Sequence, residues 1–359
     1  MLKLTDFNYY LPQQNIAQNP AEPRDSSRLM VINRSSRKFE DKHFEDLSDL
    51  ITDQYVIIRN NTKVIPARIY GEKKTGGKVE LLLLKRAGIG LKGAQWEVMT
   101  KPGLKLGQKV FFGQSSLMAE TLEVRSYTRL VEFNFHGEKF FDELSKIGHT
   151  PIPPYIRWGS DDEKKLREVY QTIYAKHQGS AAAPTAGLHF TEELDKKLID
   201  KGVQIEEVTL HVGLGTFLPV KTDQITDHEM HSEKYILNEE TAQRLNKLKR
   251  EGKKILSVGT TTTRLLESCT NRKGELVAGE SETDIFIYPP YQYKFVDAII
   301  TNFHLPKSTL LMMISAFVSV PNTMEKFVSF KDSLIGKAYQ RAIERQYRFY
   351  SFGDGMIIF

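Results

Sequence analysis

The middle of the chain reads Ala181-Ala-Ala-Pro-Thr-Ala-Gly-Leu-His-Phe190. Three alanines and a glycine leave little bulk to fill a core, so this backbone is expected to lie close to another group. Pro184 prevents a regular ladder, and Thr191-Glu192-Glu193 begins a helix directly afterwards. Free N–H groups at a helix start attract anions or polar ligands, and His189 stands just before this one. The stretch is therefore either one wall of a binding site or a tight strand-to-helix connection with a half-buried histidine.

The composition is that of a folded soluble protein. The 359 residues suffice for two or three domains, with 40% hydrophobic and 26% charged residues. The single cysteine, Cys269, cannot form an internal disulfide, and the first residues lack the apolar core of a signal peptide. The longest apolar run, at 308–320, is too short to span a bilayer and predicts a buried helix. We expect a cytoplasmic monomer without a membrane anchor, and the net charge of +5 permits RNA contact without requiring it.

A β-rich region interrupts the chain. Six short strand-like runs follow one another between glycine-rich turns, at 68–70, 78–85, 95–100, 108–112, 117–125 and 130–135. This spacing predicts a small antiparallel β-barrel at 62–148, inserted in an α/β domain made of 1–61 and 149–359. The barrel is either a scaffold or an RNA-binding module. Its basic residues are either a binding face or ordinary solvated side chains, namely Lys85, Arg86, Lys92, Lys101 and Lys105.

Beyond residue 190, helices and strands alternate, which indicates a mixed α/β architecture. Helices are expected at 191–201, 238–250, 262–268, 308–318 and 332–346, and strands at 203–212, 254–258, 283–288 and 296–301. An amphipathic helix before the 181–190 stretch is expected to carry one apolar face, made of Leu166, Val169, Tyr170, Ile173 and Tyr174.

Ligands of α/β sheets bind at loops beyond the strand ends, and three loops besides the 181–190 stretch have suitable residues. They read His211-Val-Gly-Leu-Gly-Thr-Phe-Leu-Pro-Val220, Gly259-Thr-Thr-Thr-Thr-Arg264 and Thr301-Asn-Phe-His-Leu-Pro306. Gly213 and Gly215 follow a strand as in a nucleotide-binding turn, but the extended residues after them argue against a dehydrogenase or methyltransferase fingerprint. The threonine loop suits a ribose, a carboxylate or a phosphate, or it is only a well-capped helix start.

Two further polar groups are less specific. Arg24-Asp-Ser-Ser-Arg28 offers donors for a phosphate or carboxylate, and it suits an internal salt-bridge corner equally well. His228, His231 and Glu233 suggest metal ligands, but without a fourth ligand a hydrogen-bonded cluster is the better interpretation. We therefore expect no metal.

Taken together, the loops resemble one family, the S-adenosylmethionine:tRNA ribosyltransferase-isomerases of queuosine modification. The resemblance covers nearly the whole chain. Besides the four loops it rests on Tyr10-Leu-Pro, Ile16-Ala-Gln, Arg24-Asp-Ser-Ser-Arg-Leu29, Asn61-Thr-Lys-Val-Ile-Pro-Ala-Arg68, His228-Glu-Met-His-Ser-Glu233 and Ser308-Thr-Leu-Leu311. The chain departs from the family pattern at Pro290, Phe352 and Gly355, which affects details of the 288–291 turn and of the C-terminal tail.

The resemblance implies an α/β domain with a barrel inserted after the first strands. It also implies an enzyme that transfers and isomerises the ribosyl group of S-adenosylmethionine onto 7-aminomethyl-7-deazaguanine at the tRNA wobble position. The product is epoxyqueuosine-tRNA, and adenine and methionine are released. S-adenosylmethionine is then a consumed co-substrate, which explains the missing methyltransferase fingerprint, and the partner is a tRNA anticodon stem-loop.

This chemistry needs a base for a proton beside the sulfonium, an acid for the departing adenine and a pocket rich in donors. We expect His189 and His211 as acid and base, and Asp354 as a third catalytic group in contact with the modified base. The helix start at Thr191 is expected to face the methionine carboxylate or a ribose hydroxyl. The expected substrate-binding residues are Arg24, Asp25, Arg28, Thr185, Gly187, Gly213, Gly215, Thr260, Thr261, Arg264, Asn302 and His304.

Two alternatives from other classes stay open. A conventional methyltransferase would release S-adenosylhomocysteine. A non-catalytic tRNA-binding protein would use the barrel and never consume the co-substrate.

Overall fold

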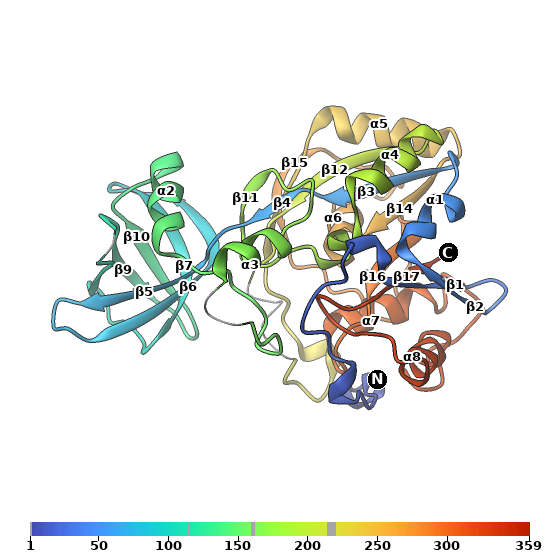
Figure 1. The fold of residues 1–359 in the computed structure, drawn as a ribbon, viewed down its shortest axis with the longest axis horizontal. Coiled ribbons are helices and arrows are strands. Elements are labelled where there is room, and N and C mark those ends of the chain that lie inside the picture. The colour runs from blue at the N-terminus through green and yellow to red at the C-terminus, as the bar shows by residue number, and fades with distance from the viewer. Residues whose placement is uncertain (1, 114, 159–161, 214–219) are drawn as a thin grey trace.

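The computed structural model describes residues 2–113, 115–158, 162–213 and 220–359, and it is built around a large mixed sheet (Figure 1). Within these residues the sheet has nine strands. In order across the sheet they are β15 (Gly279–Thr283), β13 (Glu233–Leu237), β12 (Gln204–Leu210), β3 (Tyr55–Asn60), β14 (Lys254–Val258), β16 (Ala298–Asn302), β17 (Gly355–Ile358), β1 (Arg28–Asn33) and β2 (Lys38–His43). Strands β12, β3, β14 and β16 are parallel, whereas β17 runs antiparallel to β16. The predicted α/β architecture is confirmed.

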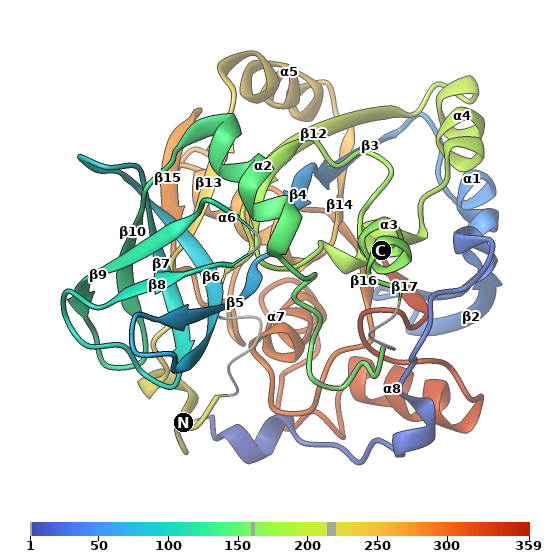
Figure 2. The same cartoon turned by 60° about the vertical axis from the view of Figure 1, so that its left-hand side comes forward.

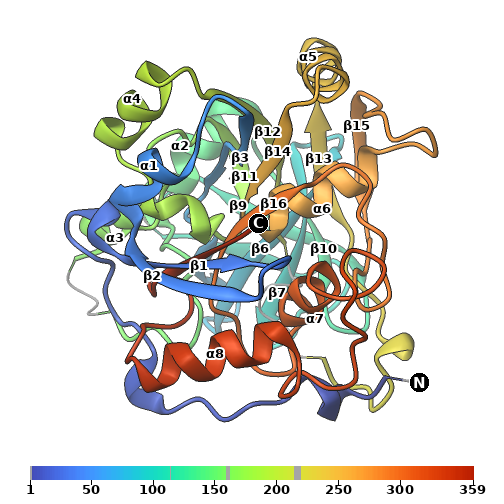
Figure 3. The ribbon, with the colours of Figure 1, turned by 90° about the vertical axis from the view of Figure 1, so that its right-hand side faces the viewer.

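Both faces of the sheet are buried, because alternate residues of each strand enter different cores. In β1, Leu29 and Val31 belong to the core that also contains residues of α1 (Leu47–Leu50) and α4 (Glu192–Asp200). Met30 and Ile32 belong to the opposite core. That second core receives residues from α5 (Glu239–Arg250), α6 (Thr260–Cys269), α7 (Thr309–Phe317) and α8 (Leu334–Glu344). Figure 3 shows α8 on one side of β1 and β2, with α1 and α4 on the other.

The apolar helix α7 is a core helix, as the sequence predicted. Its residues from Leu311 to Phe317 are all buried. With nine residues it is far shorter than the about 20 that a membrane-spanning helix needs. In the part of the chain that the structure describes, none of the helices has the length and apolarity to cross a membrane.

A closed barrel lies beside the sheet (Figures 1 and 2). Among the described residues it has six strands in the order β10-β7-β6-β5-β8-β9. They are β5 (Arg68–Lys73), β6 (Lys78–Ile89), β7 (Ala94–Lys101), β8 (Lys109–Phe111), β9 (Met118–Val124) and β10 (Arg129–Phe133). The barrel has its own apolar core, to which Phe140 and Leu144 of α2 (Gly137–Ile147) contribute. The predicted antiparallel barrel is confirmed, while its limits at 62 and 148 stay a prediction.

Short elements join the barrel to the sheet. β4 (Thr62–Val64) pairs in parallel with β11 (His177–Ser180), and β11 leads directly into the 181–190 stretch. Before β4, the backbone of Asn61 donates to Val208 O and accepts from Lys176 N. The chain that enters the barrel is therefore fixed to the same segment that carries the alanine-rich stretch.

Two predicted elements differ in the structure. The helix expected to continue to Tyr174 is α3 (Glu163–Val169), which ends earlier. It stops because the Gln171 side chain binds both the N–H and the C=O of Val64, which holds this part of the chain beside β4. The prediction of a strand at 283–288 is wrong, because β15 ends at Thr283, which pairs with Glu233, the first residue of its partner β13.

The carboxylate of Glu267 organises the chain before β16. It is fully buried on α6 and accepts hydrogen bonds from the backbone N–H groups of Lys294, Phe295 and Val296 and from the Tyr291 hydroxyl. Glu267→Ala would leave these donors buried without an acceptor, so we expect the free energy of unfolding to fall by about 3 kcal/mol or more. Chemical denaturation measures this loss. Glu267→Gln keeps one acceptor oxygen and should lose less, and equal losses in the two variants would contradict the interpretation.

Candidate active site

A cavity of about 430 Å³ lies at the carboxyl ends of β14 and β16. Six of the predicted substrate-binding residues line it, namely Thr185, Thr260, Thr261, Arg264, Asn302 and His304. All four predicted loops thus contribute lining residues at one edge of the sheet, the fourth through Val212 and Val220, where parallel α/β proteins bind their ligands. Gly215, from the fourth loop, lies outside the described residues.

The 181–190 stretch forms a tight turn in the cavity wall. Its second half, Thr185–His189, is a short 3₁₀ helix, η5, and residues 183–186 line the cavity. Only then does α4 begin, with Thr191 Oγ1 accepting from Leu194 N and donating to Asp25. Thr191 is not among the lining residues, so this helix start does not border the cavity, and its contact with a ligand stays a prediction.

Behind the cavity, His189 belongs to a chain of side-chain hydrogen bonds. Thr185 Oγ1 donates to Asn302 Oδ1 at 3.0 Å. The Asn302 amide nitrogen donates to His189 Nε2 at 3.2 Å. With Nε2 accepting, the ring proton lies on Nδ1, which donates to Ser27 Oγ at 2.8 Å. The imidazole therefore fixes the orientation of the Asn302 amide, and through it the hydroxyl of Thr185.

The two histidines predicted as acid and base are both held neutral. Burial lowers the pKa of His189 to about 3, and the charge of Arg348 adds to the shift. Burial, with a contribution from Lys234, lowers the pKa of His211 to about 4. The His211 ring binds Thr62 Oγ1 at 2.8 Å, and neither histidine is among the residues that line the cavity.

The threonine loop is a helix start without a side-chain cap. Gly259 has φ +86°, a left-handed conformation that glycine adopts without strain, and supplies no cap to α6. Thr260 is 7% exposed and lines the cavity, and its hydroxyl has no hydrogen-bond partner among the described residues. Thr261 Oγ1, in contrast, accepts from Asn60 at 3.2 Å. The Thr260 hydroxyl and the first N–H groups of α6 are therefore free to bind an anionic or polar ligand.

Arg264 and Glu233 form a buried ion pair in the cavity wall. Glu233 also accepts from Gly213 N at 3.0 Å, and Arg264 donates to the carbonyl of Thr283. The pair thus connects β13, α6 and the 211–213 segment. Both carboxylate oxygens of Glu233 are engaged, which favours the hydrogen-bonded cluster over a metal site. Over the described residues, no group of three or more His, Cys, Asp and Glu side chains is placed to hold a metal ion.

Four other predicted residues lie outside the cavity lining and hold the chain around it. Asp354 is 2% exposed and accepts from the Arg348 guanidinium at 3.0 Å. Arg24 and Arg28 donate to backbone carbonyl groups, and Asp25 accepts from the cap of α4. Arg24, Asp25 and Arg28 thus make mainly hydrogen bonds within the protein, and whether they also bind a ligand stays a prediction.

Several lining residues were not predicted, among them Tyr155, His231, Lys307 and Tyr350. The rings of Tyr155 and Tyr350 pack with their centroids 4.7 Å apart and form an aromatic wall. Lys307 and Tyr350 have φ of 60° and 73°, a conformation that is uncommon outside glycine and often found at functional sites. A lysine or tyrosine in sequence gives no sign of a left-handed backbone. His231 was considered only as a metal ligand.

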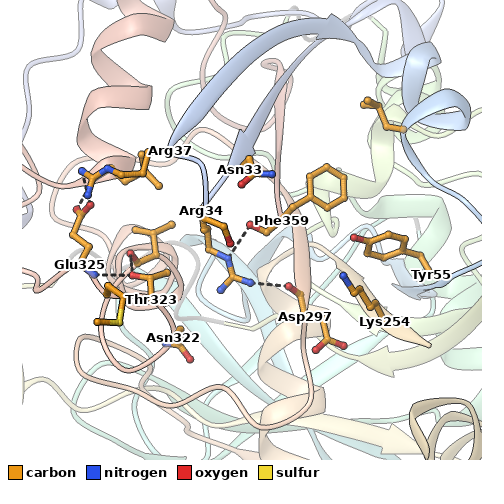
Figure 4. Close-up of a pocket in the computed structure, with 15 residues that line it drawn as sticks. Asn33, Arg34, Arg37, Tyr55, Lys254, Asp297, Asn322, Thr323, Glu325 and Phe359 are labelled. Carbon is orange, nitrogen blue, oxygen red and sulfur yellow. Dashed lines mark hydrogen bonds and ion pairs between the residues drawn. The ribbon is translucent and has the colours of Figure 1, made fainter. Parts of the chain in front are cut away.

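A larger hollow of about 870 Å³ lies elsewhere (Figure 4). Its lining includes Tyr55 and Lys254, the first residues of β3 and β14, so it opens at the amino ends of these strands. The Arg34 guanidinium is already bound to the carbonyls of Phe359, Phe317 and Asp297. The hollow contains none of the predicted loops, so we do not consider it the active site.

The fold and the cavity define an α/β enzyme domain with an inserted β-barrel. The chain matches the family model described as "Queuosine biosynthesis protein" over residues 4–358. It is 49% identical to an S-adenosylmethionine:tRNA ribosyltransferase-isomerase of Desulfitobacterium hafniense, over 99% of this chain and 100% of the relative. A relative of the same name from Thermosipho melanesiensis is 47% identical, over 100% of both chains.

The solved structure of the S-adenosylmethionine tRNA ribosyltransferase from Thermotoga maritima is also similar. It has 34% sequence identity and a TM-score of 0.54, and the match covers 99% of this chain and 100% of that chain. The chain belongs to the S-adenosylmethionine:tRNA ribosyltransferase-isomerase family. This confirms the resemblance seen in the loops.

Gly187 allows η5 to pack against Tyr174. A Cβ at Gly187 would overlap the Tyr174 hydroxyl, which is buried and has no hydrogen-bond partner among the described residues. We expect Gly187→Ala to lower the free energy of unfolding by about 1 to 3 kcal/mol through overpacking. Tyr174→Phe removes only an unpaired hydroxyl and should be close to neutral.

The double variant Gly187→Ala/Tyr174→Phe should regain part of the loss, because it relieves the overlap. Denaturation of the four proteins of this cycle measures the coupling. If the two substitutions instead have additive effects on the free energy of unfolding, contact with the Tyr174 hydroxyl is not what excludes a larger side chain at position 187.

Proposed function

We propose that this cavity is where the chain transfers and isomerises the ribosyl group of S-adenosylmethionine onto the tRNA wobble base. The relatives named for this activity match the chain over nearly its whole length. The observation that carries the assignment to this cavity is that Thr185, Thr260 and Asn302, from three separate motifs of the family pattern, meet there. Following the family resemblance, the acceptor is 7-aminomethyl-7-deazaguanine in an anticodon stem-loop, and the products are epoxyqueuosine-tRNA, adenine and methionine.

The cavity offers two kinds of surface to the co-substrate. Its donor end consists of the start of α6 and the Thr260 hydroxyl, which suit the methionine carboxylate. The aromatic wall of Tyr155 and Tyr350 suits the adenine ring. A cavity of about 430 Å³ is within the usual size of small-molecule sites. Because Arg264 is neutralised by Glu233, the helix start and the exposed Lys307 of the lining are the groups that attract the carboxylate.

Proton transfer requires a group that reaches the ligand. Among the described lining residues, His231 presents a half-buried imidazole, whereas His304 is buried and binds Thr301 Oγ1 at 2.9 Å. Burial also lowers the pKa of His304 to about 3. We therefore assign proton transfer at the ribose to His231. His211 and Asp354 act outside the cavity in this proposal, by holding the 211–213 segment and the C-terminal tail.

His189 has a positioning role in this proposal. Its Nε2 accepts from Asn302, so it sets which end of the amide faces Thr185 and the ligand. Such fixed donors and acceptors stabilise developing charge without reorganising, which is the usual source of rate enhancement in a preorganised site.

The products released decide between the proposed activity and its alternatives. With S-adenosylmethionine and an anticodon stem-loop that carries the aminomethyl base, we expect adenine and methionine to appear in equal amounts, detected by liquid chromatography and mass spectrometry. S-adenosylhomocysteine would instead identify a methyltransferase. RNA binding without loss of S-adenosylmethionine would identify a binding protein.

Two variants distinguish positioning by His189 from proton transfer. Glutamine places an acceptor near Nε2 but cannot titrate, so His189→Gln should retain kcat within about tenfold of the parent, whereas His189→Ala should lose about 10²-fold because Asn302 is misplaced. Turnover of the stem-loop substrate measures both. Equal losses in the two variants would indicate a titrating role.

The pH dependence provides an independent check. A histidine with a pKa near 3 is neutral from pH 5 to 9, so the acid limb of kcat/KM should be the same in His189→Gln and in the parent.

The depressed pKa of His189 also means that the unfolded chain binds more protons than the folded chain below about pH 6.5. The free energy of unfolding of the parent is therefore expected to fall as the pH falls from about 6.5 toward 3, because the unfolded chain gains a proton that the folded ring does not.

A further inference from the structure

The end of the barrel opposite the chain's entry carries a cluster of lysines. The chain enters the barrel at Arg68 and leaves it after Phe133, and both residues lie at the same end. At the other end β5 finishes and β6, β8 and β10 begin, and the register places β7 Lys101 opposite β6 Glu80. We define the lysine rim as the six lysines at this end, Lys73, Lys74, Lys78, Lys101, Lys105 and Lys109. In Figure 1 the turn after β5 points away from the nine-stranded sheet.

The barrel holds the net positive charge of the whole chain. Residues 68–133 contain 12 Lys and Arg against six Asp and Glu, whereas the remaining residues contain 38 against 39. Half of the barrel's basic residues belong to the lysine rim. The excess is therefore concentrated at one end of one domain.

The lysine rim is largely without compensating carboxylates. Among the described residues, Lys109 alone of the six forms an ion pair, a long one of 3.9 Å with Glu120. Glu72 lies opposite Lys78 and Glu80 opposite Lys101 in the ladders, but among the described residues neither forms an ion pair with a lysine of the rim. By contrast, Lys85 pairs with Glu282 at 2.6 Å, and Glu120 lies closer to Lys92, at 2.7 Å, than to Lys109. Clustered like charges repel one another, so an uncompensated rim favours a polyanionic partner.

We propose that the lysine rim binds the phosphate backbone of the same tRNA whose wobble base enters the cavity. Lysines act as point charges toward phosphates and carry no sequence information, which suits contacts to a stem away from the modified base. Tyr127, 76% exposed in the turn between β9 and β10 at the same end, offers a ring for stacking on a ribose or base. The inference rests on the proposed function in that it takes tRNA as the partner.

The test compares two triple variants that remove the same charge. Lys74→Ala/Lys78→Ala/Lys101→Ala removes three exposed lysines of the rim. Lys196→Ala/Lys273→Ala/Lys337→Ala removes three exposed lysines of the α/β domain. Circular dichroism and thermal melting confirm that each is folded. Dissociation constants for unmodified full-length tRNA are then measured without S-adenosylmethionine between 50 mM and 300 mM salt.

We expect the rim variant alone to bind tRNA about 10²-fold more weakly at low salt. Its plot of log affinity against log salt should be shallower by about 2.7 if each lysine meets one phosphate. With modified tRNA, KM should rise while kcat at saturation stays unchanged. Equal affinities and slopes in the two variants would overturn the proposal, as would a loss of binding to phosphatidylserine vesicles but not to tRNA.

The binding assay does not depend on turnover, so the two proposals fail separately. If the rim variant loses tRNA affinity but the parent releases no adenine, the proposed function is wrong and the rim assignment stands. If adenine is released and both variants bind tRNA as the parent does, the rim assignment is wrong and the function stands.

Discussion

The ion pair between Arg264 and Glu233 is the contact on which the cavity depends. It connects the antiparallel edge of the sheet, through β13, with α6 and with the backbone of Gly213. Both side chains are less than 8% exposed, so neither charge has water to replace its partner. Removal of one member of such a pair typically costs about 3 to 5 kcal/mol, because the other is left buried and unpaired. This part of the cavity wall is thus stable only as a unit, because the two buried charges cancel each other.

Internal cancellation leaves a small number of polar groups free for a ligand. Asn302 and Thr185 are oriented by His189, and Thr261 is bound by Asn60. The Thr260 hydroxyl and the N–H groups of α6 have no such partner among the described residues. A sulfonium co-substrate carries both a cation and a carboxylate. The buried Arg264–Glu233 pair adds no net charge to the wall, and the helix start offers the carboxylate end a binding position.

The sequence predicts the architecture well because hydrophobic periodicity and turn residues are local signals. The six barrel strands and most helices appear where the pattern places them, and the loops at the strand ends converge because parallel strands end together. Roles of single residues are harder to predict. His189 attracts attention as a titratable residue in a glycine-rich stretch, but its environment is set by Ser27 and Asn302, which are distant in sequence.

The same limit applies to charge. Of the basic residues singled out in the barrel, Lys85 and Lys92 turn out to be paired with carboxylates, and only Lys101 and Lys105 belong to the lysine rim. Which cations stay uncompensated depends on register and closure, which a linear pattern does not contain. The structure therefore separates two kinds of recognition. The cavity is a small site for shape and hydrogen bonds, with its buried charges paired, whereas the barrel presents an uncompensated charge that is effective at a distance and independent of sequence. An enzyme that must select one base within a large polyanion needs both, and in the proposed assignment the inserted barrel supplies the second.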